Sequence, residues 1–432
     1  MTVTVRTVPL DDPRPLLAIA AELPAAHRSV FVHGGEGLVT AGELAAVPVP
    51  AGTGRLAAAR TGLDGLLADA TVDDPVRMPG TGPIAVGSFT FDPSTPGSVL
   101  RVPRIVIGRR DGVTWRTEIT EIGRPGEDAP AASGTTGAST IGAADPSTGT
   151  ADTSATTGEV DRPRYAGSTL DDAAWLEAVA GTIAAIRGGA FEKAVLARDV
   201  RLWSRTPFAI DDVLQRLADR FPSCFTFLVD GLVGASPELL LRRRGGAVSS
   251  RVLAGTAPRG HDEADDARMG AELLASAKDR WEHDLAARSV TDVLGRFCAD
   301  VVAPEGPSLV QLDNVQHLGS DVTGTLAGDV HVLDVLDALH PTAAVAGTPR
   351  DAAVAHIASV EGMDRGRYAG PVGWCDADGD GEFAIALRCA EVEGTRARLF
   401  AGAGVVGASL PEAELMETWL KLRAMTDVLT RR

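Results

Sequence analysis

The sequence predicts an α+β fold built around a large, mostly antiparallel β-sheet. Residues 1–120 alternate short apolar runs with turn residues, several later apolar runs are joined as hairpins, and helical patterns are interspersed among them. The chain has 432 residues, which is long enough for one to three domains at roughly 150 residues per domain.

The first part of the chain, residues 1–122, is predicted to be strand-rich. Candidate strands lie at 29–35, 84–92 and 102–108, with a few helices among them. From 123 to 164 the composition changes to Gly, Ala, Ser, Thr, Pro and Asp, with almost no large apolar residue. Such a segment cannot bury enough surface to offset its ordering entropy, so we expect a disordered or mobile insertion there.

Residues 165–432 carry the longest periodic patterns. A helix is predicted over 171–186, where apolar residues recur at helical spacing and a Gly-Gly pair follows. The strand that contains Lys193 comes next. Further helices are predicted at 211–221, 263–277, 279–299, 332–339 and 412–429, and further strands at 224–229, 232–234, 239–243, 248–253, 314–318, 372–376, 382–389 and 397–401.

Charge and composition restrict the class of protein. The net charge is −17, which makes nucleic acid and anionic membranes poor partners. The four cysteines are scattered without C-x-x-C spacing, which argues against a zinc site or a disulfide framework. Apolar runs are too short to span a membrane, and the N-terminus lacks the pattern of a signal peptide. We therefore expect a cytoplasmic protein.

Two familiar motifs do not fit their usual structural context. Residues 402–407 match the dinucleotide fingerprint G-x-G-x-x-G, but the chain ends at Arg432 and leaves no room for the second strand that this site needs. Residues 376–381 imitate the start of a calcium-binding loop, but the position of the bidentate glutamate is Leu387. A polar hairpin turn is the better interpretation of the second motif.

Lysine is rare in this chain. Of 41 basic residues only three are lysines, namely Lys193, Lys278 and Lys421. Arginine keeps its proton in proteins, whereas lysine can lose one and serve as a base. Each lysine is therefore a candidate functional residue.

Two predicted helices each carry a pair of carboxylates three residues apart, Asp279 with Glu282 and Glu414 with Glu417. This spacing places each pair on one helix face, and two such faces could offer the oxygen ligands that Mg²⁺ prefers. From the spacing alone, two solvated acidic helix faces are the favoured interpretation. Glu238 lies at a tight turn between apolar strands, where a partly buried carboxyl could act as a general acid, although the pattern alone favours a surface glutamate at a turn.

Taken in order, these segments resemble the family of chorismate-utilising enzymes. The resemblance runs from about residue 190 to the C-terminus and is carried by the blocks KAVLAR (193–198), GASPE (234–238), LAGTAPRG (253–260), SAKDRWEH (276–283), VQHL (315–318), LHPT (339–342), RYAGPVGW (367–374), AGAGVV (401–406) and PEAE (411–414) through Lys421. It implies large antiparallel sheets with helices packed outside, with residues 1–122 as part of the same fold and 165–432 as the chorismate-binding catalytic region.

The lysine of the first block indicates the branch of the family. Members that make isochorismate or salicylate have a lysine at the position of Lys193, as the base that activates water. Members that add ammonia typically lack it, so the resemblance implies no glutamine amidotransferase subunit. Ala344 is similar to the alanine of isochorismate synthases, although Val345 departs from their usual leucine, and Tyr368 occurs in both branches. Isochorismate synthase is therefore expected, with salicylate synthase or an inactive chorismate-binding protein as alternatives.

The resemblance also implies how the substrate is held. Glu282 and Glu417 would hold Mg²⁺ against the ring carboxylate of chorismate, with Asp279 and Glu414 as further ligands. Arg388 would bind the enolpyruvyl carboxylate. Three more positions would complete carboxylate binding, namely Lys421, Gly255 and Gly402.

For the reaction itself, the resemblance implies that Lys193 deprotonates the water that attacks C2 and that protonated Glu238 donates to the departing C4 hydroxyl. His317 would lie near that hydroxyl, and Thr256 and Ala344 would shape the pocket. Lys278 has no implied role. We expect a monomer, and the resemblance leaves open whether the product enters menaquinone or siderophore biosynthesis.

Overall fold

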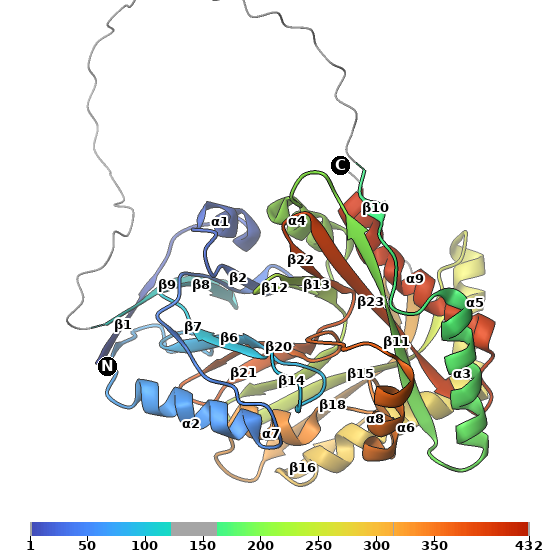
Figure 1. Ribbon diagram of the computed structural model, residues 1–432. Helices are drawn as coiled ribbons and strands as arrows, with labels where there is room; N and C mark the ends of the chain where they lie inside the picture. The colour runs from blue at the N-terminus through green and yellow to red at the C-terminus, as the bar shows by residue number, and fades with distance from the viewer. Residues whose placement is uncertain (1, 122–161, 314, 431–432) are drawn as a thin grey trace, which may run out of the picture.

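The computed structural model describes residues 2–121, 162–313 and 315–430. Two large sheets lie one above the other, and the helices cover their outer faces and one end (Figure 1). One sheet has 13 strands and the other has 10. Strands β1 and β5 pair in parallel, and every other pairing among the described residues is antiparallel. The predicted fold class is confirmed.

The 13-stranded sheet has the order β10-β11-β23-β22-β13-β12-β2-β3-β8-β9-β1-β5, with β19 also paired to β11. Its strands are β1 (Val3–Pro9), β2 (Ser29–His33), β3 (Glu36–Ala41), β5 (Thr71–Asp73), β8 (Ile105–Arg110), β9 (Val113–Glu121), β10 (Arg164–Tyr165), β11 (Lys193–Trp203), β12 (Phe225–Val229), β13 (Leu232–Ser236), β19 (Gly347–Thr348), β22 (Cys389–Glu393) and β23 (Arg396–Val406).

The 10-stranded sheet has the order β16-β18-β15-β14-β21-β20-β6-β7-β4, with β17 also paired to β18. Its strands are β4 (Ala45–Ala46), β6 (Ile84–Ser88), β7 (Val99–Val102), β14 (Leu239–Arg244), β15 (Ala247–Pro258), β16 (Cys298–Val302), β17 (Ser308–Gln311), β18 (Val315–Leu326), β20 (Pro371–Asp376) and β21 (Gly381–Ile385).

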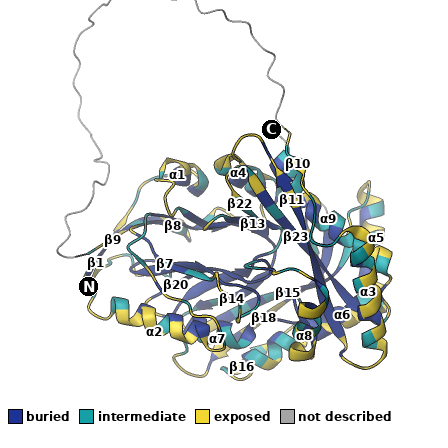
Figure 2. Ribbon diagram, in the orientation of Figure 1, coloured by how far each residue is buried: buried dark blue, intermediate teal, exposed yellow. Residues whose placement is uncertain are grey.

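The helices are α1 (Leu16–Glu22), α2 (Arg55–Leu67), α3 (Asp172–Arg187), α4 (Ile210–Arg220), α5 (Glu263–Ala275), α6 (Ala277–Leu294), α7 (Val332–Leu339), α8 (Arg350–Val360) and α9 (Pro411–Thr430). Helices α6 and α7 pack on the 10-stranded sheet, whereas α1, α4 and α9 pack on the 13-stranded sheet. The strands between them are buried and the outward faces of the helices are exposed (Figure 2). The apolar core therefore fills the space inside the helical cover.

The chain crosses between the two sheets at two neighbouring places. Strand β13 of the larger sheet leads through Glu238 into β14 of the smaller sheet, and β21 returns through Arg388 to β22 of the larger one. Backbone hydrogen bonds join the two crossings, because Ile385 N donates to Glu238 O at 3.1 Å and Ala235 N donates to Arg388 O at 3.2 Å. These crossings therefore place both side chains at the junction of the sheets.

Several sequence-based boundaries were wrong. The helix predicted over 279–299 ends at Leu294, where the backbone N–H of Gly295 caps the last turn, and β16 begins at Cys298. The strand predicted at 382–389 is two strands in different sheets, β21 and β22. Helix α8 was not predicted. Strand β18 extends far beyond the predicted segment, whose Asn314 lies outside the described residues.

Most of the segment predicted to be an insertion, residues 123–164, also lies outside the described residues, which resume at Arg162. The two rejected motifs have ordinary structural roles in this fold. Residues 402–406 continue β23 and pair with β11 in place of turning into a helix. Residues 376–381 form the predicted hairpin turn, between β20 and β21.

Candidate active site

A cavity lies between the ends of the two sheets, at the crossings. It contains about 690 Å³ of atom-free space, a figure that includes its opening to solvent. The predicted site residues that line it are Glu238, Gly255, Thr256, Glu282, His317, Ala344, Val345, Tyr368, Arg388, Gly402, Glu417 and Lys421. Distant parts of the sequence thus meet in one place. Lys193, Asp279 and Glu414 lie outside this lining.

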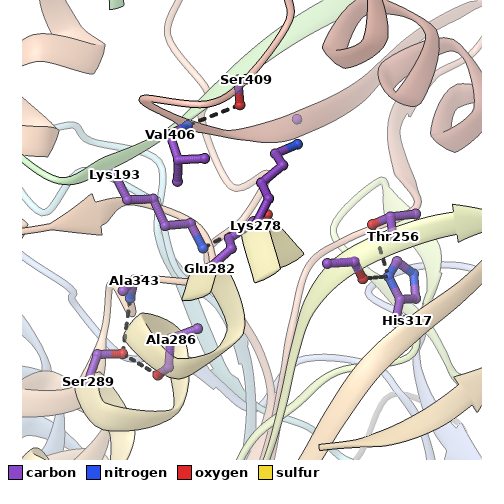
Figure 3. A network of polar contacts seen from close by, with 12 residues as sticks. Lys193, Thr256, Lys278, Glu282, Ala286, Ser289, His317, Ala343, Val406 and Ser409 are labelled. Carbon is purple, nitrogen blue, oxygen red and sulfur yellow. Dashed lines mark hydrogen bonds and ion pairs between the residues drawn. The ribbon is translucent and has the colours of Figure 1, made fainter. Parts of the chain in front are cut away.

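Lys193 is the first residue of β11 and is fully buried. Its Nζ lies 3.2 Å from Glu282 Oε1, an ion pair whose geometry does not make a well-directed hydrogen bond (Figure 3). The pairing of β11 with β23 sets Lys193 opposite Val406 and Val195 opposite Gly404. The ammonium group therefore sits directly behind the part of the cavity wall that Glu282 forms.

Glu282 of α6 and Glu417 of α9 both face the cavity, and each is paired with a lysine. Lys421 Nζ donates to Glu417 Oε1 at 2.6 Å and to the carbonyl oxygen of Gly402 at 2.9 Å. Two carboxylates with room for water or substrate oxygens are a common donor set for Mg²⁺. Among the described residues, no group of three or more His, Cys, Asp or Glu side chains could hold a metal ion by itself.

The other two predicted metal ligands are engaged elsewhere. The Asp279 carboxylate accepts a hydrogen bond from Ser276 Oγ at the start of α6. Glu414 is buried and accepts hydrogen bonds from Lys278 Nζ, at 2.8 Å, and from the side chain of Ser409. Burial and the nearby Glu417 raise the pKa of Glu414. The structure therefore brings together only one carboxylate of each predicted pair at the cavity.

Glu238 is a cavity residue whose pKa is strongly shifted. Burial raises the pKa of its carboxyl from 4.5 to about 8, although a backbone hydrogen bond from Leu253 and the charges of Lys193 and Lys421 oppose the shift. The side chain is therefore mostly protonated at neutral pH. A buried, protonated carboxyl that faces a cavity can donate a proton to a bound molecule.

His317 of β18 lies beside Arg388 and the bulge at Gly255. Arg388 Nη2 lies 3.0 Å from His317 Nε2, and a guanidinium group can only donate, so Nε2 accepts this hydrogen bond. The ring proton is then on Nδ1, which lies 3.2 Å from the carbonyl oxygen of Gly255 and donates to it. Burial and the positive charge of Arg388 lower the pKa of His317 well below its usual value, which keeps the ring neutral.

The remaining wall is shaped by close backbone approach. A Cβ at Gly404 would lie 2.0 Å from Glu282 Oε1, and one at Gly402 would lie 3.2 Å from the Tyr368 hydroxyl oxygen. Tyr368 in turn stacks on Phe400 of β23 with ring centroids 5.0 Å apart. The glycine-rich stretch thus forms a crowded wall of the pocket. Sequence reasoning missed Gly404, although the fingerprint-like spacing of glycines marked its position.

Arg365 is a second cavity residue that sequence reasoning missed. Its guanidinium donates to the carbonyl oxygens of Val195, at 2.6 Å, and Val345, at 2.9 Å, and is paired with buried Glu361. Glu361 in turn accepts from the backbone N–H of Ala197. The pair joins β11 to the Ala344 loop. The only signal in the sequence is that Glu361 and Arg365 are four residues apart, a spacing at which oppositely charged side chains often pair on helices.

Comparison with known proteins identifies the family. Residues 2–430 match the family model described as chorismate binding enzyme. The chain belongs to this family.

Among curated members of the chorismate-binding family, the chain is 45% identical to isochorismate synthase DhbC of Bacillus subtilis over 255 residues, which are 56% of this chain and 64% of that protein. It is 36% identical to the salicylate biosynthesis isochorismate synthase of Pseudomonas aeruginosa over 388 residues, 84% of this chain and 77% of that protein. The match thus spans less than two thirds of the length of the Bacillus relative.

A solved structure extends the comparison to the whole fold. The protein from Bacillus anthracis that is named as a candidate 2,3-dihydroxybenzoate-specific isochorismate synthase, DhbC, superposes with a TM-score of 0.77 and 29% identity. The match covers 96% of this chain and 99% of that one. Among the described residues, no helix is long and apolar enough to cross a membrane.

Proposed function

We propose that this chorismate-binding enzyme is an isochorismate synthase, which converts chorismate to isochorismate. The observation that carries the proposal is the protonated Glu238 carboxyl in the cavity wall, together with the buried Lys193 side chain that lies behind Glu282 of the same wall. Names of relatives such as DhbC of Bacillus subtilis agree with this assignment.

The proposed reaction is an isomerisation that needs one base and one acid. Water attacks C2 and its proton passes to Lys193, which must be neutral at that moment. The ring double bonds shift, the C4–O bond breaks, and the departing hydroxyl takes the proton of Glu238 and leaves as water. One water is consumed and one is released. The raised pKa of Glu238 supports its part, because the carboxyl holds its proton at neutral pH.

Chorismate is a dianion, and each of its two carboxylates would have a binding group in the cavity. Arg388 would take the enolpyruvyl carboxylate with the N–H groups that His317 leaves free. The ring carboxylate would lie near Lys421 and the backbone of Gly255 and Gly402. Glu282 and Glu417 would hold Mg²⁺, which would neutralise charge on this carboxylate when bound.

The product distinguishes the candidate activities. Purified protein incubated with chorismate and Mg²⁺, followed by chromatographic separation, is expected to give isochorismate. Salicylate with an equal amount of pyruvate would instead assign the chain to salicylate synthases. Anthranilate formed only with ammonium would contradict water as the nucleophile, and chorismate binding without turnover would indicate an inactive binding protein.

We further propose that the enzyme works in the cytoplasm as a monomer and without a glutamine amidotransferase subunit. The presence of Lys193, which suits water as the nucleophile, supports the absence of an ammonia-supplying partner. Light scattering after size-exclusion chromatography tests the monomer directly. A mass of twice 44.7 kDa would contradict it.

A further inference from the structure

The two helices that carry the cavity carboxylates rest on different sheets. Helix α6, with Glu282, packs on β15 and β18 of the 10-stranded sheet, and α9, with Glu417, packs on β23 of the 13-stranded sheet. The distance between the two carboxylates therefore depends on how the sheets are held together at this end. A site for a small ion needs that distance fixed to within a fraction of an ångström.

Lys278 connects the two helices. Its Nζ donates to Glu414 Oε1 at 2.8 Å, from the first turn of α6 to the first turn of α9. Glu414 is almost completely buried, with 1% of its surface exposed. Burial disfavours the charge of Lys278, but the attraction of Glu414 outweighs it and raises the pKa of the lysine. The pair is thus a charged contact between a buried carboxylate and a partly exposed lysine side chain.

The contact continues into the strand pair that carries Lys193. The Ser409 side chain donates to Glu414, and Ser409 Oγ accepts from the backbone N–H of Val406 at 3.1 Å. Val406 lies opposite Lys193 in the register of β11 and β23. Figure 3 shows Lys278, Glu282, Lys193, Val406 and Ser409 gathered at this junction.

Helical spacing connects the Lys278–Glu414 contact to the two carboxylates of the cavity. Lys278 precedes Glu282 by four residues on α6, and Glu414 precedes Glu417 by three on α9. Each residue of the contact thus lies one turn before a cavity carboxylate on the same helix face. Moving the contact would move both carboxylates.

We propose that Lys278 and Glu414 are positioning residues whose ion pair sets the separation of Glu282 and Glu417 and so the affinity of the site for a divalent cation. This inference rests on the proposed function, which assigns that cation to the two cavity carboxylates. Lys278 thereby has a role, and Glu414 would position the cation site without binding the cation itself.

The sign of the effect separates this proposal from a simple charge effect. If Lys278 acted only as a nearby positive charge, its removal would tighten cation binding. If it holds the helices together, its removal weakens binding. Lys278→Met alone tests this sign, because Glu414 keeps its carboxylate, and this variant is expected to bind the cation more weakly than wild type. The double variant Lys278→Met with Glu414→Gln removes one charge of each sign, so the net charge stays constant while the contact is lost. It also avoids leaving a buried carboxylate without a partner, which could prevent folding.

Mn²⁺ is a suitable probe because it shares the oxygen-ligand preference of Mg²⁺ and its binding is measured by electron paramagnetic resonance without turnover. The full chain, freed of metal, is titrated with Mn²⁺. The double variant is expected to bind it about tenfold or more weakly than wild type, the usual cost of losing a group that orients a ligand. The separate variant Lys278→Arg, which can keep the contact with Glu414, is expected to retain most of the wild-type affinity for Mn²⁺.

The matched control is the ion pair of Arg220 Nη1 with Asp427 Oδ2, 2.9 Å, which joins α9 to α4 away from the cavity. The double variant Arg220→Met with Asp427→Asn is expected to lose thermal stability but keep its Mn²⁺ affinity. Unchanged or tighter Mn²⁺ binding in the Lys278/Glu414 variant would overturn the positioning role while isochorismate formation by wild type still stood. Absence of both Mn²⁺ binding and isochorismate in wild type would overturn both proposals.

Discussion

Each rare lysine of this chain meets a carboxylate at or beside the cavity. The pairs are Lys193 with Glu282, Lys278 with Glu414, and Lys421 with Glu417. The sequence identified the lysines and both carboxylate pairs, but helical spacing places both members of a pair on the same face. Which member reaches the cavity depends on its neighbours from other elements, such as Ser276 and Ser409, and these contacts are tertiary.

The raised pKa of Glu238 predicts how the stability of the protein depends on pH. Its pKa is about 8 in the folded protein against 4.5 for the free side chain, so the folded state favours the protonated form. As pH rises from about 4.5 through 8, the unfolded chain ionises first and stability is lost. The melting temperature of Glu238→Gln, which cannot ionise, should therefore rise relative to wild type between pH 5 and pH 9.

The activity of the wild-type enzyme should fall as pH rises through about 8, because the proton donor is lost. Glu238→Gln should lose kcat by ~10²–10⁴ below about pH 8, and the difference from wild type should narrow above that pH. A variant whose melting temperature tracks that of wild type across this range would show that Glu238 titrates normally in the fold.

His317 predicts a difference between two conservative variants. In Gln the side-chain oxygen can lie near the place of Nε2 and still accept from Arg388, whereas the shorter Asn cannot reach that far. A hydrogen bond to a charged group is typically worth ~1.5–3 kcal/mol. His317→Asn should thus raise the KM for chorismate by about tenfold or more, and His317→Gln should raise it much less. Equal losses of kcat in both, with KM unchanged, would assign His317 to proton transfer instead.

At the scale of single elements, the sequence predicted the bounds of helices well where apolar residues followed the helical period throughout the segment. Helices α3, α7 and α9 lie within one or two residues of their predicted bounds because apolar residues recur at helical spacing in each. Prediction was wrong where a strand ended without a turn residue. Ala386, Leu387 and Arg388 continue an apolar-rich run, so nothing local separates β21 from β22.

Strand β23 gives a prediction at this scale. A methyl group at Gly404 would meet Glu282 Oε1 at 2.0 Å, and since that atom ends a flexible side chain it can move aside at little cost to folding. Gly404→Ala should therefore fold normally but lose activity by about 10²-fold, because a displacement of this size misplaces the carboxylate.

Gly407→Ala is the matched control for that variant, because its nearest contact would be 3.6 Å, from Ile186 Cγ2. It should keep both activity and stability. Comparable activity losses in the two variants would remove the reason to place Glu282 at the centre of the site.

The whole molecule explains why residues so far apart in sequence form one site. Two antiparallel sheets are joined by crossings at Glu238 and Arg388, and the strands after these crossings diverge into separate layers. Strand β11 brings Lys193 to the same end from the larger sheet. Local sequence patterns predicted many of the strands but not the sheet to which each belongs, because pairing partners are chosen by long-range contacts. The family resemblance, and not periodicity, supplied the expected meeting of these residues.

Water activated by Lys193 is the proposed nucleophile at C2 of chorismate. Turnover in H₂¹⁸O followed by mass spectrometry at early times tests it most directly. The predicted result is isochorismate with one ¹⁸O at C2, and a loss of at least about 10²-fold in rate for Lys193→Gln with the fold retained. Product without the label, or near-full activity of that variant, would contradict the account.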